Sequence, residues 1–396
     1  MNKLILNTGV QDFINKNWNT DIVSVLLKKP FFEGISQKEL AEQLEAKKKC
    51  KDKLPTWFST QNIFYPNKLS VEQSSSERTA AYKSNLVTGQ TLLDLSGGLG
   101  IDSYYFSKKV DTIYHCEVNL ELSQIAEYNF EVLSKKNVRC IPEDGLSFLK
   151  KFDLSFDWIY ADPSRRNDLK KKVILLQDCL PNVPENLFFL FERTKNILIK
   201  TSPILDISEA IRELLFVKEV HVVAVDNEVK EVLYLLEKGF EGESIFKTVN
   251  LLNQDTDTFE FIPSQEKQAA LVLDAPKKYL YEPNAAILKS GAFKLTGERL
   301  GLAKLHLNSH LYTSEELLKF PGRRFLIESV ESFSQKNIKR FKGQKANITV
   351  RNFPITVAEI RKKNKILDGG DTYLFFTKNH DEGLIIIECR RVLSTE

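Results

Sequence analysis

Short apolar segments alternate with amphipathic segments along the middle of this chain, and this alternation constrains its fold more than any other feature. Five stretches of strand length occur in order, namely TLLDLS, TIYHCEV, VRCI, FDWIYAD and NILIK, and four of them lead into segments with helical spacing. Strands that alternate with helices usually lie parallel in one sheet with helices on both faces. Residues 89–262 are therefore predicted to form an α/β domain with a Rossmann-like sheet.

The alternation ends before this domain does. Three further strand-like segments, EVHVVAV, EVKEVLYLLEKGF and ESIFKTVNL, follow each other too closely for crossover helices. Turn signals between them favour an antiparallel pair. We expect a sheet of seven strands with an antiparallel terminal hairpin, an ending that is unusual for dinucleotide dehydrogenases.

The segments on either side of this domain have different patterns. The first 88 residues read as helical, with Ser36 and Glu39 at capping-box spacing, and KLPTWFSTQNIFYP is expected to be a docking loop. Residues 263–320 hold one good helix, Ala285 to Ala292, and residues 321–396 have an α+β pattern. A chain of 396 residues is too long for one ordinary core. The predicted domains are 1–88, 89–262, 263–320 and 321–396.

Composition narrows the possible cellular location and the kind of partner. No apolar run is long enough to span a bilayer, and the first residues lack the features of a secretory signal. Five scattered cysteines without a C-x-x-C pair indicate reduced thiols and a cytoplasmic location. Residues 321–365 hold twelve Lys and Arg against three Glu. This excess predicts an anionic partner, although a solvated lysine-rich face explains it equally well.

The stretch LLDLSGGLGIDS contains the first candidate site. Glycines between a strand and a helix let the backbone turn tightly and approach a ligand, and the helix start presents free N–H groups. The spacing G-G-x-G differs from the G-x-G-x-x-G of pyrophosphate binders. The candidate cofactor-binding residues here are Asp94, Ser96, Gly97, Gly98, Gly100 and Asp102.

Carboxylates also follow the next two predicted strands. Glu117 closes TIYHCEV, at the position where dehydrogenases place the acid that accepts hydrogen bonds from both ribose hydroxyls. Asp144 follows VRCI and can accept a hydrogen bond from the amino group of an adenine. An acid that caps a turn or faces solvent is the alternative for each.

The fourth strand ends in the run ADPSRR, residues 161–166. The Asp162-Pro163 pair lies where ligands of open α/β sheets bind. A carboxylate and a backbone carbonyl at this position could accept both N–H hydrogens of an exocyclic amine and free its lone pair for attack. Arg165 could stack on a base or bind a phosphate, whereas a salt-bridged loop explains Arg165 and Arg166 equally well.

These four features, in this order, resemble the class I methyltransferases that use S-adenosylmethionine, whose sheets usually end in an antiparallel hairpin. The resemblance covers Thr91 to about Ile262. It implies that Asp94 and the glycines border the methionine part of S-adenosylmethionine, that Glu117 binds the ribose and that Asp144 binds the adenine.

The resemblance further implies that Asp162 faces the methyl acceptor, with Pro163 and Arg165 completing the predicted catalytic set. Methyltransferases of this class that act on amines usually read D/N-P-P followed by an aromatic residue, which stacks on the target base. This chain reads D-P-S-R and lacks both the second proline and the aromatic residue.

The run YADPSRR also resembles a more particular bacterial group, together with the downstream segments YEPNAAILKSGAF, LHLNSHLYTSEEL, FPGRRF and VRNFP. These methyltransferases carry a ferredoxin-like segment and a C-terminal THUMP-like domain. Since THUMP domains bind structured RNA, the resemblance implies methylation of a base nitrogen in tRNA or rRNA. The candidate RNA-binding residues are Arg166, Arg323, Arg324, Lys339, Arg340, Lys342 and Arg351.

Other functions stay open. A small-molecule methyltransferase would share the cofactor site but has no use for a basic appendage, and a non-catalytic RNA-binding protein could keep the fold. The glycine spacing and the antiparallel ending disfavour a nicotinamide-dependent dehydrogenase. His306 and His310 lack the Glu of H-E-x-x-H, so we expect structural histidines and no metal. Glu282-Pro283-Asn284 is expected to shape a substrate-facing loop or to pack domains together. The oligomeric state is left open.

Overall fold

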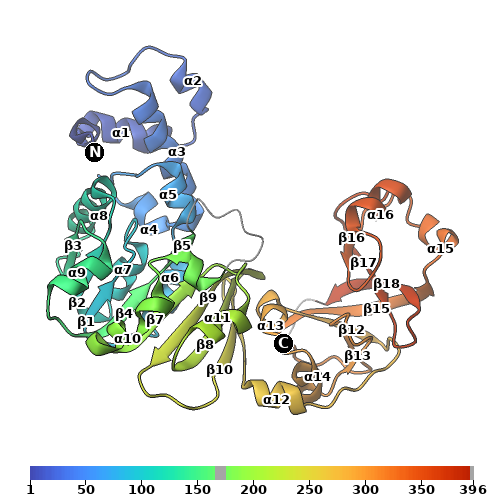
Figure 1. Ribbon diagram of the computed structural model, residues 1–396. Coiled ribbons are helices and arrows are strands. Elements are labelled where there is room, and N and C mark those ends of the chain that lie inside the picture. Colours follow the sequence, from blue (N-terminus) through green and yellow to red (C-terminus); the bar gives the residue numbers. More distant parts are fainter. Residues whose placement is uncertain (166–174, 393–396) are drawn as a thin grey trace. The chain divides into compact units, whose positions relative to one another are not determined.

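The computed structural model describes residues 1–165 and 175–392 (Figure 1). Arg166, one of the predicted RNA-binding residues, lies outside them. The chain divides into two compact units, of which the first comprises Met1–Glu219 and Lys230–Gly242 and the second Val220–Val229 and Glu243–Glu396.

Within the described residues, the larger sheet has nine strands in the order β11-β10-β8-β9-β7-β4-β1-β2-β3. They are β1 (Gly89–Asp94), β2 (Val110–Cys116), β3 (Val138–Ile141), β4 (Phe156–Ala161), β7 (Thr194–Thr201), β8 (Val217–Val225), β9 (Glu228–Glu237), β10 (Ile245–Leu251) and β11 (Thr256–Phe261). Strands β3, β2, β1, β4 and β7 are parallel, and β9 runs antiparallel to β7.

The predicted parallel-rich sheet with an antiparallel ending is confirmed, but the predicted count of seven strands was wrong. The sheet has two strands more than predicted, and one of them, β11, pairs with β10 in an antiparallel hairpin. Its sequence TDTFEF is largely exposed and has only one fully buried residue, Phe261. Backbone hydrogen bonds rather than a buried face therefore define this edge strand, and they leave little trace in the hydrophobic pattern.

Helices connect the parallel strands and begin at the carboxyl edge of the sheet. They are α7 (Ile101–Phe106), α8 (Leu120–Val132), α9 (Gly145–Lys151), α10 (Val183–Arg193) and α11 (Ile207–Glu213). Side-chain caps define several of these starts, for example Asn119 before α8 and Asp206 before α11. The strand order reverses between β1 and β4, so ligands are expected at the carboxyl ends of these two strands.

The helical N-terminal region is confirmed. It contains η1 (Lys3–Leu6), α1 (Thr8–Asn17), α2 (Ile22–Leu26), α3 (Gln37–Lys53), α4 (Pro55–Ser59), α5 (Lys68–Gln73) and α6 (Glu77–Ser84). The predicted capping box is present, because the Ser36 side chain accepts from the Glu39 N–H and the Glu39 carboxylate accepts from the Ser36 N–H.

These N-terminal helices share one hydrophobic core with α7 and α8. The stretch expected to be a docking loop contains α4 and buries Trp57, Phe64 and Tyr65. The buried Asn129 of α8 accepts from the Phe64 N–H at 3.0 Å and donates to the Phe64 carbonyl at 2.9 Å. The N-terminal region is therefore an integral part of the first unit.

The second unit contains a seven-stranded sheet in the order β13-β14-β12-β15-β18-β17-β16. Its strands are β12 (Tyr279–Pro283), β13 (Ala303–Lys304), β14 (Tyr312–Ser314), β15 (Gly322–Ser332), β16 (Asn347–Val350), β17 (Thr372–Lys378) and β18 (Leu384–Val392). Its helices are α12 (Pro263–Gln268), α13 (Ala285–Ser290), α14 (Lys294–Leu300), α15 (Gln335–Lys339) and α16 (Val357–Asn364). Phe325 and Phe341 lie in its hydrophobic cores and Phe353 packs against one of them. In residues 1–165 and 175–392, no helix is both long and apolar enough to cross a membrane.

Candidate active site

The glycine-rich loop between β1 and α7 is built around a buried acid. Asp94 is 1% exposed; its Oδ1 accepts from the Ser96 N–H at 3.0 Å and its Oδ2 from the Ser103 hydroxyl at 2.7 Å. The Gly97 N–H donates to the Cys116 carbonyl of β2 at 2.7 Å. Asp94 thus holds the loop from inside instead of facing an open cleft.

Two of the loop glycines are required by close packing. A Cβ on Gly97 would lie 2.3 Å from Cε1 of the buried His115 ring, and a Cβ on Gly100 would lie 2.4 Å from Cζ of Phe130. Gly100 also has φ +83°, which disfavours other residues. A Cβ on Gly98, by contrast, would meet only the Ser96 carbonyl at 3.9 Å. The loop is therefore open above Gly98 and filled below Gly97.

Glu117 lies beside this opening at the end of β2. Its Oε2 accepts from the Gly98 N–H at 2.8 Å, and its Oε1 accepts from the Asn119 N–H at 2.7 Å. Each carboxylate oxygen can accept another hydrogen bond, so the group can still bind two hydroxyls. The structure therefore brings Glu117 and the glycine loop together.

Asp144 reaches the same edge from β3. It caps α9, with its Oδ1 accepting from the Ser147 N–H at 2.8 Å, and it is exposed. A Cβ on the next residue, Gly145, would lie 2.7 Å from Cα of Leu95, which follows β1 directly. The start of α9 therefore packs against the end of β1, and one oxygen of Asp144 remains able to bind a ligand.

Asp162 and Pro163 follow β4 and are linked to the loop of β1. The Asp162 N–H donates to the Ser96 hydroxyl at 2.7 Å, and the Asp162 carboxylate forms an ion pair with Lys200 of β7. The Asp162 side chain is 33% exposed and Lys200 only 12%. Pro163 is buried, and the chain continues into β5 (Ser164–Arg165), which pairs with β6 (Cys179–Leu180).

Asp102 belongs to a buried group of charges. Lys83 of α6 lies 3.1 Å from Oδ1 of Asp102 and 2.7 Å from Oε2 of Glu231. Oδ2 of Asp102 accepts from the Ser75 hydroxyl at 2.8 Å and from the Tyr160 hydroxyl at 2.9 Å. We call Lys83, Asp102, Asp162, Lys200 and Glu231 the charge cluster.

The pKa shifts within the charge cluster follow from burial opposed by ion pairing. Burial disfavours the charged form of Lys200, but Asp162, Asp102 and Glu231 outweigh that penalty and raise its pKa. Burial likewise opposes the charge on Asp102, yet Lys83 and Lys200 lower its pKa. For Glu231 burial prevails and raises the pKa. Lys200 is therefore an ammonium group across the physiological pH range.

Sequence reasoning missed Ser75, Lys83, Lys200 and Glu231. Glu231 lies 148 residues from Lys83, so no local pattern could connect them. A charged residue within an otherwise apolar strand was the available signal, since Lys200 ends NILIK and Glu231 precedes VLYLL. Such residues are rarely buried unless they are paired.

The predicted RNA-binding arginines of the second unit contact other residues of that unit, whereas the predicted lysines are exposed. Arg323 and Arg351 both pair with the buried Glu282 of β12, and Arg340 pairs with Glu331 and Glu388. Arg324 is half-buried and donates to the Leu318 carbonyl at 3.4 Å. Lys339 and Lys342 are exposed, and within the described part of the chain they form no ion pair.

His306 and His310 make separate contacts in this unit. Nε2 of His306 lies 2.6 Å from the Glu382 carboxylate, whereas the His310 ring stacks on Phe293 with 3.6 Å between centroids. Burial, followed by the nearby Lys304 and Arg351, lowers the pKa of His310 to about 4. Among residues 1–165 and 175–392, no group of three or more His, Cys, Asp or Glu could hold a metal ion.

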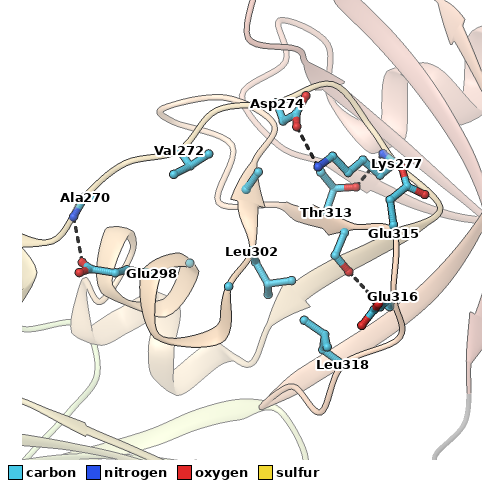
Figure 2. Close-up of a pocket in the computed structure, with 14 residues that line it drawn as sticks. Ala270, Val272, Asp274, Lys277, Glu298, Leu302, Thr313, Glu315, Glu316 and Leu318 are labelled. Carbon is cyan, nitrogen blue, oxygen red and sulfur yellow. Dashed lines mark hydrogen bonds and ion pairs between the residues drawn. The ribbon is translucent and has the colours of Figure 1, made fainter.

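A cavity of about 560 Å³ lies in the second unit and contains none of the predicted site residues (Figure 2). Residues 270–277, α14, β13 and the segment after β14 line it. Its acidic lining residues are Asp274, Glu298, Glu315 and Glu316. Lys277 pairs with Asp274, and Glu298 accepts from the Ala270 N–H (Figure 2).

Comparisons with known proteins cover the whole chain. Residues 279–321 match a ferredoxin-like domain family, and residues 322–391 match a THUMP domain-like family. A crystal structure from Porphyromonas gingivalis W83, of a protein assigned to the methyltransferases, is 34% identical with a TM-score of 0.88, and the match covers 99% of each chain. An uncharacterized RNA methyltransferase from Mycoplasma mobile is 28% identical over 202 residues, 48% of this chain. That match spans 54% of the curated relative, about half its length.

Proposed function

Because the chain belongs to the bacterial class I methyltransferase family of the P. gingivalis protein, with a ferredoxin-like segment and a THUMP-like domain, we propose that it methylates a base nitrogen in structured RNA with S-adenosylmethionine as donor. One observation carries the proposal. Ser96 joins the glycine-rich loop after β1 to Asp162 after β4 through a hydrogen bond of 2.7 Å. Candidate cofactor-binding and acceptor-facing residues therefore meet at the point where the strand order reverses.

The residues at this edge fit S-adenosylmethionine. Gly98 would border its methionine part, because the loop is open above this residue, while Asp94 and the His115 ring hold the loop from inside. Glu117 would accept hydrogen bonds from the ribose hydroxyls, and Asp144 from the adenine amino group. When bound, S-adenosylmethionine supplies a sulfonium methyl group, whose C–S electron pair stays on sulfur as the new N–C bond forms.

Asp162 is the acceptor-facing residue in this proposal. Its partly exposed carboxylate accepts an N–H of the target amine, which keeps the nitrogen lone pair directed at the methyl group. The same carboxylate takes the proton that the methylated nitrogen releases. Lys200 does not act as the base, because its neighbouring carboxylates hold it in the ammonium form.

RNA as the acceptor is supported by the THUMP-like domain and by the exposed lysines of the second unit, Lys339 and Lys342. We propose tRNA or rRNA as the class of RNA. A base inside a duplex must be unstacked to reach a catalytic carboxylate, so a loop or an exposed end is the expected target. Within the described part of the chain no disulfide joins any of the five cysteines, which supports a reducing, cytoplasmic location.

The test is calorimetric titration with S-adenosylmethionine, followed by transfer of a tritiated methyl group to total cellular RNA. Glu117→Gln removes a charge-assisted acceptor and is expected to weaken cofactor binding by about tenfold. Glu127→Gln is the matched control, since Glu127 is an exposed glutamate on α8, the helix that follows Glu117. Cofactor binding without transfer to RNA would favour a small-molecule acceptor, and absence of binding would favour a non-catalytic RNA-binding protein.

A further inference from the structure

The proposed catalytic acid is held at two points. Its backbone N–H donates to the Ser96 hydroxyl, and its carboxylate pairs through Oδ2 with Lys200. Among the side chains that the structure describes, which do not include that of Arg165, none forms a hydrogen bond to the other oxygen, Oδ1. The Asp162 side chain is one-third exposed, and a carboxylate oxygen without a partner can accept a hydrogen bond from a ligand.

Within the part of the chain that the structure describes, Lys200 has no comparable alternative partner. The other carboxylates that attract it, Asp102 and Glu231, are both paired with Lys83 at 3.1 and 2.7 Å. Ser75 and Tyr160 also donate to Asp102. The Lys200 side chain is only 12% exposed, so its ammonium group gains little from solvent if the ion pair with Asp162 is broken. The rest of the charge cluster thus leaves Lys200 and Asp162 as a pair.

We propose that Lys200 is a positioning residue for methyl transfer. Its ammonium fixes the Asp162 carboxylate through Oδ2 and leaves Oδ1 to accept the hydrogen of the acceptor amine. A carboxylate on a strand end, partly exposed, would otherwise rotate among several orientations. The inference rests on the proposed function, because it assigns Lys200 a role in the reaction of Asp162.

The test compares Lys200→Met, Lys200→Arg and the control Lys195→Met, an exposed lysine on the same strand. Each variant is assayed for unfolding by urea, for S-adenosylmethionine affinity and for kcat and KM with RNA. Lys200→Met is expected to lower kcat by about 100-fold, the usual effect of a misplaced catalytic group, with cofactor affinity and the KM for RNA within about twofold of wild type. Lys200→Arg keeps the ion pair and is expected to restore most of kcat.

A double-variant cycle separates positioning from every other role of Lys200. If Lys200 acts through Asp162, adding Lys200→Met to Asp162→Asn changes the residual kcat by less than about threefold. This double variant removes one positive and one negative charge together, so the net charge of the cluster is unchanged and the variant remains informative if Lys200→Met alone unfolds. A crystal structure of Lys200→Met is expected to show Asp162 in a different orientation.

Contrary results distinguish the two proposals. Losses that multiply in the double variant, or a Lys200→Met variant that loses RNA affinity instead of kcat, would overturn the positioning role and identify Lys200 as a direct RNA contact. A fully active Lys200→Met enzyme would overturn it as well, while leaving the methyltransferase assignment intact. A wild-type protein that binds no S-adenosylmethionine would overturn the proposed function and this inference together.

Discussion

At the scale of single residues, neighbouring glycines of the glycine-rich loop are required for different physical reasons. Gly97 is needed because the His115 ring fills the space where a side chain would begin, and His115 is fully buried and 3.0 Å from the Ser103 hydroxyl. Gly98 has open space around it, so within the protein its backbone conformation, φ +57°, is what favours glycine. The consecutive positions therefore form a matched pair for mutation.

Gly97→Ala is expected to destabilise the first unit by about 2 kcal/mol, since an added methyl group overpacks a buried site. It is also expected to weaken S-adenosylmethionine binding, because the loop must move away from His115 to admit the methyl group. Gly98→Ala should cost about 1 kcal/mol from its left-handed conformation alone. Urea unfolding and calorimetry measure both effects. A Gly98→Ala variant as damaged as Gly97→Ala would show that the His115 contact is unimportant.

At the scale of elements, the N-terminal helices depend on the α/β sheet as much as on one another. Asn129 of α8 satisfies both backbone groups of Phe64, which lies between α4 and α5, and all these atoms are buried. The Lys83 ion pairs with Asp102 and Glu231 attach α6 to α7 and β9 in the same unit. These contacts join segments that are distant in sequence.

Asn129→Ala is expected to destabilise the protein by roughly 3 kcal/mol, because it leaves a buried N–H and a buried carbonyl without partners. Asn129→Asp should be less harmful if the new carboxylate accepts a hydrogen bond from the Phe64 N–H and a water molecule donates one to the Phe64 carbonyl. Fluorescence of Trp57, which lies in the shared core, follows the unfolding transition in urea when Trp18 and Trp158 are replaced by Phe, and circular dichroism is recorded in parallel. If the fluorescence and circular dichroism transitions of this protein separate, the N-terminal region folds independently and this account is incorrect.

The same elements show which parts of the fold and site a sequence can predict. The Ser36–Glu39 cap and the helix at Ala285 involve residues a few positions apart, and their spacing predicted them. The alternation of apolar strands and helices predicts that Asp94, Glu117 and Asp162 lie at strand ends on the same edge of the sheet. The partners of those residues do not follow, because Lys200, Lys83 and Glu231 come from other elements and their pairing is decided only by tertiary packing.

At the scale of the whole molecule, the basic side chains that the structure describes in the second unit differ in whether they form internal ion pairs or are exposed without one. Several basic side chains of the second unit are paired internally, as Arg323 and Arg351 are with Glu282. These arginines are expected to support the link between β12, β15 and the end of β16 more than to contact phosphates. Exposed lysines on and after α15, namely Lys339 and Lys342, are the better candidates for RNA contacts.

The double variant Lys339→Glu/Lys342→Glu is expected to weaken RNA binding and to reduce its dependence on salt. Each lost phosphate contact lowers the slope of log affinity against log salt by about 0.7 to 0.9, so the slope should fall by about 1.5. The control Lys136→Glu/Lys150→Glu makes the same change in net charge at exposed positions of the first unit. Binding is measured by fluorescence anisotropy with labelled tRNA at several salt concentrations.

Cofactor affinity should remain unchanged in both double variants, because neither alters the edge of the larger sheet where the glycine-rich loop and Glu117 lie. Equal weakening by the two variants would mean that RNA responds to net charge alone and that the THUMP-like domain has no dedicated surface. If only the control weakens binding, the RNA surface belongs to the first unit. If only Lys339→Glu/Lys342→Glu weakens RNA binding, the chain combines a methyl-transfer site with a separate surface that selects structured RNA. A small-molecule acceptor would then be disfavoured, because it would not need that surface.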